Sequence, residues 1–335
     1  MPNFGTGDQF NRSTYETELA FIYNDGADTS TVQVKFSNVV GMTPYILDAW
    51  TGIVSPVLHY SLNGTSIIMP ITLAPNQTTI IAFGTSANSS LPPSPTAIVT
   101  SISDSVIDLS YSFSNTSQVL LAYLSGEKPA SITLSTGETR YFNTTEPPEA
   151  SNLTTWDISI QDWHAADDIY SMETVIDTYT YNSSSLATWV DIDPVVLTNI
   201  SGIGQYATQF TTPVFVGSTG YLGARLHLGP VSDSVRVWVN GARLLPVEAI
   251  GGVSDVVINI PTAYMVASGG VQANELRIEV ATTLYNRIRA DMDTVMTLGR
   301  PVTYTNAAYF EANSAKSYGL VGPVWIEWLE VVEVL

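Results

Sequence analysis

Carboxylates are the residues of this chain whose chemistry is easiest to recognise. An acid–base pair for hydrolysis needs two of them flanking the bond that breaks, a few ångströms apart. The candidates are Asp157, Asp162, Asp167, Asp168, Glu173, Asp191 and Asp193. Neighbours such as Asp167 and Asp168 would point to opposite faces of a strand, whereas Asp191 and Asp193 would share a face if "WVDID" is extended. A shared face suits a structural Ca²⁺ ion as well as an acid–base couple.

Aromatic side chains offer a second kind of chemistry, the binding of sugars. The C–H face of a sugar packs on an exposed ring, while its hydroxyls bond to amide, carboxylate or guanidinium groups. The candidate residues are Trp163, Trp189, Tyr206 and Trp238, with Asn286 and Arg287 of "YNR" as polar partners. The alternative is that these rings pack inside the protein and that Arg287 pairs with an acid. For Trp238 we favour packing, under a loop or against a neighbouring domain.

Composition excludes several classes of function. The chain has no cysteine, so disulfides, thiolate chemistry and Cys-ligated zinc are ruled out. His59, His164 and His227 lack the spacing of a metal site. Twelve Lys and Arg stand against 31 Asp and Glu, a net charge of −19 that repels nucleic acid. No apolar run approaches the ~20 residues of a membrane-spanning helix, so we expect no membrane partner either.

Nine Asn-x-Ser/Thr sequences indicate passage through the secretory pathway. Their asparagines are Asn11, Asn63, Asn76, Asn88, Asn115, Asn143, Asn152, Asn182 and Asn199. The first residues, "MPNFGTGDQF", have neither the basic nor the apolar region of a signal peptide. We therefore expect a secreted glycoprotein of which this chain is the C-terminal part.

Short strands are the elements that must position these residues. Runs rich in β-branched and aromatic residues recur along the chain, separated by Gly, Asn, Asp and Pro, as in "TVQVKFS" (31–37) and "SIIMPITL" (66–73). In "SVRVWVNGARLLPV" (234–247) an Asn-Gly turn joins two alternating runs, which predicts a hairpin with a type I′ turn. One helical turn at 261–268 and a short helix or loop at 306–317 interrupt the pattern, and no long amphipathic helix is predicted.

These patterns predict an all-β protein of tandem antiparallel β-sandwiches, ending in a jelly roll. The Ser/Pro-rich stretch at 85–97 and the Pro-containing stretch at 143–152 separate its parts. We expect a β-sandwich at 1–90, a short β-meander at 91–150 that shares a sheet with what precedes or follows it, and a jelly roll at 151–335.

Four blocks in the last part resemble a known family. They are "ATWVDIDPVVLTNISGIGQYATQF" (187–210), "GARLHLGPVSDSVRVWVNGARLLPV" (223–247), "NELRIEVATTLYNRIRA" (274–290) and "YGLVGPVWIEWLEV" (318–331). Their order resembles the galactose-binding-like jelly roll of the α-L-rhamnosidase-like enzymes of glycoside hydrolase family 106. It is also similar to the sugar-binding domain of family 2 glycosidases. Residues 21–60, with "DAWTG", are similar to the β-domain that follows the catalytic barrel in such proteins.

The resemblance implies accessory domains, because the catalytic acids of the family lie in a (β/α)₈ barrel that these residues do not form. The expected function is a non-catalytic, carbohydrate-binding or structural region of a secreted α-L-rhamnosidase-like hydrolase. Its expected partners are that barrel and a plant or microbial polysaccharide, and jelly rolls of this type often carry a structural Ca²⁺. Two alternatives stay open: a stand-alone lectin-like protein, and a complete hydrolase or lyase with an acid pair borne on a sandwich.

Overall fold

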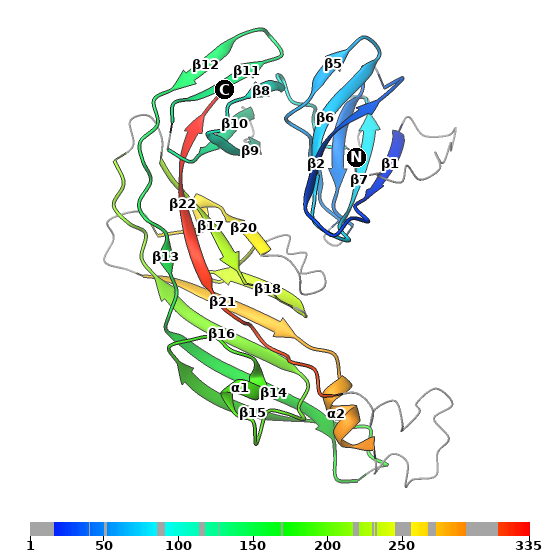
Figure 1. Ribbon diagram of the computed structural model, residues 1–335, viewed down its shortest axis with the longest axis vertical. Helices are drawn as coiled ribbons and strands as arrows, with labels where there is room; N and C mark the ends of the chain where they lie inside the picture. The colour runs from blue at the N-terminus through cyan, green and yellow to red at the C-terminus, as the bar shows by residue number, and fades with distance from the viewer. Residues whose placement is uncertain are drawn as a thin grey trace. The chain divides into compact units, whose positions relative to one another are not determined.

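The computed structural model confirms the all-β prediction. It describes residues 17–39, 41–49, 52–85, 91–113, 118–126, 128–168, 170–216, 221–229, 231, 233–244, 256–266, 273–292 and 314–335. Antiparallel strands make up most of these residues, and the helices among them are the short α1 (Trp189–Ile192) and α2 (Tyr285–Ala290) and the 3-10 turn η1 (Thr262–Tyr264) (Figure 1). No helix in these ranges combines the length and apolar character that crossing a membrane requires.

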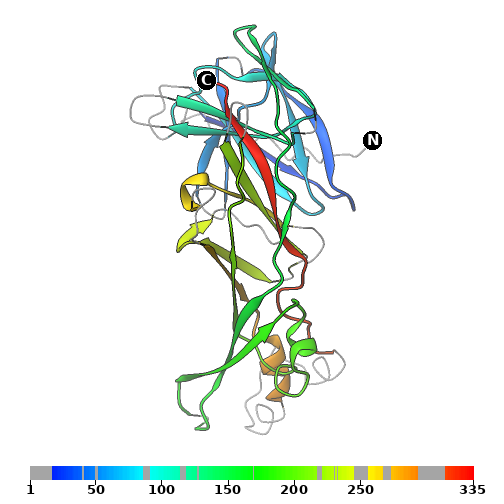
Figure 2. The same cartoon turned by 90° about the vertical axis from the view of Figure 1, so that its left-hand side faces the viewer.

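The chain divides into two compact units. Unit 1 comprises residues 1–149, 213–224 and 328–335, and unit 2 comprises 150–212 and 225–327. The division falls inside β17 (Tyr221–Leu228) and β22 (Val324–Glu333), so each of these strands contributes residues to both units. Strand β22, drawn in red in Figure 2, is a single ten-residue strand. The boundaries at 90 and 150 stay predictions.

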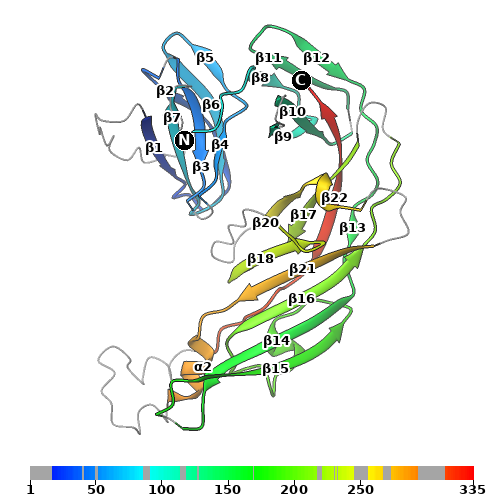
Figure 3. The same ribbon diagram turned by 180° about the vertical axis from the view of Figure 1, so that it is seen from behind.

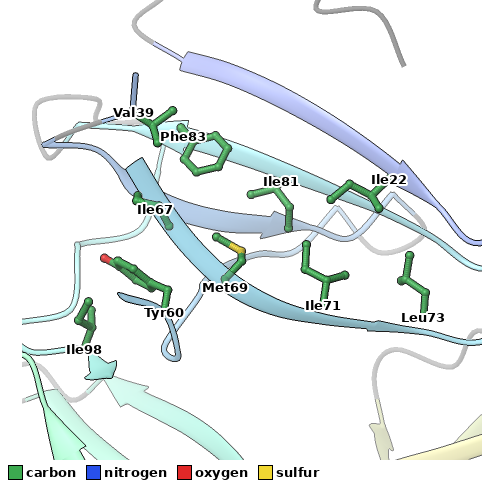
Figure 4. Close-up of a cluster of buried hydrophobic side chains, with 10 residues drawn as sticks. All are labelled: Ile22, Val39, Tyr60, Ile67, Met69, Ile71, Leu73, Ile81, Phe83 and Ile98. Atoms are coloured by element: carbon green, nitrogen blue, oxygen red, sulfur yellow. The ribbon is translucent and has the colours of Figure 1, made fainter. Parts of the chain in front are cut away.

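The first part of unit 1 consists of two antiparallel sheets. One has the order β1-β7-β3-β4 and the other β2-β6-β5. Their strands are β1 (Thr17–Tyr23), β2 (Ser30–Phe36), β3 (Thr43–Leu47), β4 (Val54–Pro56), β5 (Ser61–Asn63), β6 (Ser66–Leu73) and β7 (Thr78–Gly84). Alternate residues of β6, among them Ile67, Met69 and Ile71, meet Ile81 and Phe83 of β7 in a buried cluster (Figure 4). This alternation is why "SIIMPITL" forms a strand with one buried face.

The second part of unit 1 also has two layers. One sheet has the order β12-β11-β8, and the other sets β9 and β10 beside the end of β22. The strands are β8 (Val99–Ile102), β9 (Val106–Phe113), β10 (Gln118–Leu124), β11 (Ala130–Leu134) and β12 (Thr139–Phe142). Leu120, Ala122 and Ile132 pack in one buried cluster with Val332 and Val334 from the far end of the chain. The short meander thus completes its core with the C-terminal strand.

Unit 2 is built around a six-stranded sheet of order β15-β14-β16-β21-β18-β19 (Figure 3). Its strands are β14 (Trp156–Ala165), β15 (Thr174–Ser183), β16 (Ile203–Phe210), β18 (Ser234–Val239), β19 (Ala242–Leu244) and β21 (Asn274–Ala281). The second sheet contains β13 (Ser151–Asn152), β20 (Val256–Ile260) and the unit 2 residues of β17 and β22. Alternate residues such as Ile158, Ile278 and Val237 are buried, and their neighbours point outward.

The predicted hairpin at Asn240-Gly241 is confirmed. Both residues have positive φ, 50° and 79°, as a type I′ turn requires. The Asn240 side chain anchors the turn by bonding to the Tyr264 carbonyl and to Asn274 Oδ1. The turn sets the register, so that Trp238 lies opposite Arg243.

Four segments differ from the expectation or lie partly outside the described residues. "WVDI" is not extended but forms α1, because Thr188 caps the segment by accepting a hydrogen bond from the Asp191 N–H. The sequence pattern also missed α2, which follows β21 directly. The second run of the predicted hairpin forms β19 as far as Leu244, and positions 245–247 lie outside the described residues, as do 306–313 of the predicted short helix or loop.

Candidate functional site

The six-stranded sheet of unit 2 has one buried face and one face directed outward, which we call the outer face. Paired residues cross it in rows. One row joins Arg243, Trp238, Arg277, Ala207, Asp157 and Asn182. The next row joins Arg236, Glu279, Gln205, Ser159 and Thr180. Hydroxyl, amide and charged groups therefore form the floor of this face, where directly opposite side chains contact one another.

Trp238 lies on the outer face and not in the core. Its ring is partly exposed, and the guanidinium carbon of Arg277 lies 4.1 Å from the ring centroid. This cation–π contact covers one side of the indole. On the next row, Arg236 Nη1 lies 3.3 Å from Glu279 Oε1. Trp238 thus packs against a side chain of its own sheet.

Trp163 lies on the same outer face, near the far end of β14. Its ring is partly exposed and its Nε1 donates to Gln161 Oε1 at 2.9 Å. Three strand spacings and six residues of β14 separate it from Trp238, which corresponds to about 25 Å. The two tryptophans therefore flank a mainly polar surface, interrupted by Ala207, Ile203 and Ala281, that is long enough for several sugar units.

Trp189 and Tyr206 are buried, which corrects the expectation that they offer sugar platforms. Their exposures are 1% and 0%. Trp189 Nε1 donates to Tyr206 Oη at 2.7 Å, and the Leu320 N–H donates to the same oxygen at 3.1 Å. Burial raises the pKa of Tyr206 to about 12. Trp189 and Tyr206 therefore pack inside the protein, as the alternative interpretation expected.

Asn286 is a structural residue as well, since it is 2% exposed. Its amide nitrogen donates to the Lys316 carbonyl at 2.9 Å, and the Lys316 N–H donates to its Oδ1 at 2.8 Å. These two bonds tie α2 to the segment that leads into β22. With both ends of its amide occupied inside the protein, Asn286 is not placed to bind a sugar.

Arg287 pairs with carboxylates, as the alternative interpretation expected. Its Nη1 lies 3.2 Å from Asp162 Oδ2, and its Nε lies 2.9 Å from Asp291 Oδ2. Asp162 is 3% exposed. Burial raises the pKa of Asp162, and the Arg287 guanidinium opposes that rise.

The register also sets Asp162 opposite Asp177, which makes them the paired carboxylates of this sheet end. His164 Nε2 lies 3.1 Å from Asp177 Oδ2. The bond from His164 to the Ala165 carbonyl, and then the one to Asp177, raises the pKa of His164. Because Asp162 is enclosed and held by Arg287, this pair lacks the open access that a substrate needs.

The other carboxylate candidates are scattered. Asp157 is exposed on the outer face, while Asp167, Asp168 and Glu173 are exposed in the segment between β14 and β15. Asp168 Oδ1 accepts the Tyr170 N–H, a turn contact.

Asp191 and Asp193 do not share the face of a strand, because the segment is helical. Asp191 Oδ2 accepts from Thr188 Oγ1. Asp193 Oδ1 accepts the Val195 and Val196 N–H groups, and its Oδ2 accepts from Tyr181 Oη at 3.2 Å. In the described ranges, no three His, Asp or Glu side chains are grouped to hold a metal. Asp193 is the C-cap of α1 and Asp191 bonds to its N-cap, Thr188, so the Ca²⁺ prediction gains no ligand set from these positions.

Sequence reasoning missed a polar cluster on the second sheet of unit 2. The His227 ring stacks on Trp325, with centroids 3.7 Å apart and planes at 11°. His227 Nε2 lies 3.0 Å from Glu327 Oε2, and Arg225 Nε donates to Asn259 Oδ1 at 3.1 Å. The alternation in "ARLHL" and "VWIEW" could have predicted this cluster. It places the polar residues on the faces opposite the buried leucines and isoleucine.

The asparagines of six Asn-x-Ser/Thr sequences lie in the described residues, and all six are exposed. They are Asn63, Asn76, Asn143, Asn152, Asn182 and Asn199. Asn11, Asn88 and Asn115 lie outside the described residues.

With this geometry in hand, comparison with known proteins adds one informative likeness. No protein-family model and no curated protein matches the chain. A rhamnosidase from Novosphingobium sp. PP1Y is similar in structure, with a TM-score of 0.56 and 17% sequence identity. The similarity covers 97% of this chain and 24% of that one. A β-glucuronidase from Faecalibacterium prausnitzii aligns with 55% of this chain at 12% identity and a TM-score of 0.33.

The first likeness defines the class of fold. The chain is a protein of tandem antiparallel β-sandwiches, and the path of nearly all of it recurs in about a quarter of a rhamnosidase. At this level of identity the likeness concerns the fold, and function has to be argued from the site.

Proposed function

We propose that this chain is a non-catalytic, carbohydrate-binding accessory region of a larger, secreted α-L-rhamnosidase-like glycoside hydrolase. The observation that carries the proposal is the outer face of unit 2, where Trp163 and Trp238 stand at either end of a floor of hydroxyl and amide side chains. Stacking on a ring and hydrogen bonding to a polar floor are the two contacts by which proteins hold sugars in water.

Two further observations support the proposal. The chain aligns with 24% of a protein named as a rhamnosidase, which is the relation of a part to a whole. The exposed asparagines of the Asn-x-Ser/Thr sequences are accessible to glycosylation enzymes, as a protein of the secretory pathway requires. The expected partners are a plant or microbial polysaccharide and the catalytic barrel of the same parent protein.

Affinity electrophoresis of the purified chain in gels containing plant and microbial polysaccharides tests the proposal. We expect at least one polysaccharide to retard the chain, and the double variant W163A/W238A to lose about tenfold or more in affinity. The matched control is Tyr141→Ala, which removes an aromatic ring that is 79% exposed in unit 1. If the double variant is retarded as strongly as the unmodified chain, sugar binding does not depend on the outer face.

A second measurement tests the non-catalytic part. The chain alone is incubated with an aryl α-L-rhamnoside and with each polysaccharide that retards it. We expect no release of product, since Asp162 of the carboxylate pair on β14 and β15 is buried and held by Arg287. Turnover that disappears in Asp162→Asn would instead make the chain a hydrolase.

A further inference from the structure

The surroundings of Trp238 are unusual for this chain because they are rich in arginine. The whole sequence has 12 Lys and Arg. Arg243 lies opposite Trp238 on β19, Arg277 lies opposite it on β21, and Arg236 precedes it by two residues on β18. All three arginines therefore lie on the outer face around one indole.

The register of the hairpin produces this grouping. With a two-residue turn at Asn240-Gly241, Val239 pairs with Ala242 and Trp238 with Arg243. A turn one residue longer would send Arg243 to the buried face. The Asn-Gly turn thus places Arg243 opposite Trp238, and the pairing of β18 with β21 places Arg277 opposite it on the other side.

Two of the three arginines are available for a ligand. Arg236 is paired with Glu279 at 3.3 Å. Among the described residues, no carboxylate lies within ion-pair distance of Arg243 or Arg277. Glu275 is exposed two residues before Arg277, so the patch holds three arginines and two glutamates. It carries a local excess of positive charge in a chain of net charge −19.

The contact between Arg277 and Trp238 also prepares the guanidinium for binding. The guanidinium carbon rests 4.1 Å from the ring centroid, which holds the group in place. A guanidinium stacked on a ring keeps N–H donors at its edge, and these match the two oxygens of a carboxylate or sulfate. Ala207 is the next residue of the row, and its small side chain leaves room beside Arg277.

We propose that the Trp238 end of the outer face binds an anionic saccharide, with Arg243 and Arg277 holding its carboxylate or sulfate group beside the indole. This inference rests on the proposed function, whose sugar-binding face it shares, and it adds the class of ligand. The acidic remainder of the protein repels polyanions, so binding of this kind has to be local.

Affinity electrophoresis with matched polysaccharide pairs tests the inference. Polygalacturonate and alginate are each compared with their carboxyl-reduced forms, and chondroitin sulfate with its desulfated form. We expect an acidic member to retard the chain about tenfold more strongly than its neutral counterpart, and this preference to fall as salt is added. Dependence on the carboxylate or on the sulfate ester identifies the anion.

The double variant R243Q/R277Q should lose that preference and keep its melting temperature. Arg140→Gln is the control, because Arg140 is a surface arginine of unit 1 that lies 2.9 Å from Glu138, outside the patch. The variant Arg277→Lys keeps the charge but lacks the planar fork, so an intermediate loss is expected.

The outcomes separate the two proposals. Equal retardation by acidic and neutral members, or a preference unchanged in R243Q/R277Q, would overturn the anionic ligand and leave sugar binding intact. Retardation by none of these polysaccharides, nor by any neutral one, would overturn both. Retardation by a single-stranded oligonucleotide with loss in R243Q/R277Q would make the patch a nucleic-acid site and also refute the inference.

Discussion

Two pairs of aromatic residues in unit 2 differ in their surroundings, although all four were expected to offer rings to a sugar. Trp189 and Tyr206 are enclosed and bonded to each other, with Trp189 Nε1 donating to Tyr206 Oη at 2.7 Å. Trp163 and Trp238 are partly exposed on the outer face, and each contacts a polar side chain of its own sheet. For the three rings on strands, the face of the strand decides what a ring does, because alternate residues of one strand meet either the core or the solvent, while Trp189 is brought to Tyr206 by the helix α1.

The largest expected effect comes from removing one ring of the buried pair, Trp189 and Tyr206. Trp189→Ala removes a buried ring and leaves Tyr206 Oη with one donor fewer, so we expect a loss of about 3–5 kcal/mol in the free energy of unfolding. Chemical denaturation followed by tryptophan fluorescence measures it. A loss no larger than that of Trp238→Ala would contradict the division into enclosed and open rings.

The next effect concerns the enclosed ion pair at the end of the same sheet. Arg287→Gln leaves the carboxylate of Asp162, which is 3% exposed, without its cation, and we expect a loss of about 2–4 kcal/mol at neutral pH. Because burial then raises the pKa of Asp162 without the opposing charge of Arg287, the folded state binds its proton more tightly than the unfolded state, and the loss grows as pH rises.

The open counterpart of that pair is the control. Arg236→Gln breaks the pair with Glu279, in which the Arg236 side chain is 58% exposed, and should cost less than about 1 kcal/mol. Asp162→Asn combined with Arg287→Gln should restore part of the stability. If that double variant is no more stable than Arg287→Gln, the buried charge is not the cause.

A smaller effect is the contribution of Asp233 to the pH dependence of the free energy of unfolding. Burial raises the pKa of Asp233 from 3.8 to about 6, against the opposing charge of Lys316. The folded state therefore holds this proton more tightly, and its contribution to stability is lost as pH rises from about 4 to about 6, by about 1 kcal/mol because solvent screens this half-buried carboxyl. Urea denaturation across this range should show a flatter profile for Asp233→Asn. Identical slopes for the two proteins would refute the assignment.

The smallest expected effect concerns the two tryptophans on the outer face, Trp163 and Trp238. Trp163→Ala and Trp238→Ala should each lower the free energy of unfolding by about 1 kcal/mol or less, since both rings lie on the outer face. Melting temperatures measured by circular dichroism check this. A loss of several kcal/mol in the free energy of unfolding would show that these rings stabilise the fold. It would weaken the proposal that they bind sugar.

Much of the fold could be predicted from local patterns. The alternation of "SIIMPITL" and "SVRVWV" is enough to make each a strand with one buried face, and Asn240-Gly241 specifies its turn through φ alone. The helix α1 was not predicted, because a single N-cap at Thr188 outweighed the strand preference of the β-branched residues in "WVDI". Only the combination of cap and context decides such short segments.

The candidate site was predictable in part. Trp163 and Trp238 were named as platforms, but nothing local distinguished them from Trp189 and Tyr206. Arg277 was not named because it lies 39 positions from Trp238, and the stacking of His227 on Trp325 joins residues 98 positions apart, whereas Arg243 follows from the predicted hairpin. Such neighbours follow from strand order and register, which depend on the packing of the whole sheet.

By itself the sequence determined the class of the fold, the hairpin at Asn240-Gly241 and the absence of thiol chemistry, since these follow from local periodicity, backbone torsions and composition. Tertiary structure alone decided which aromatics are enclosed, that Arg277 faces Trp238, and that Val332 and Val334 complete a core that includes Val99. The physical reason is that burial and pairing are properties of segments brought together from distant positions, and a strand's own residues say which face is apolar but not what covers it.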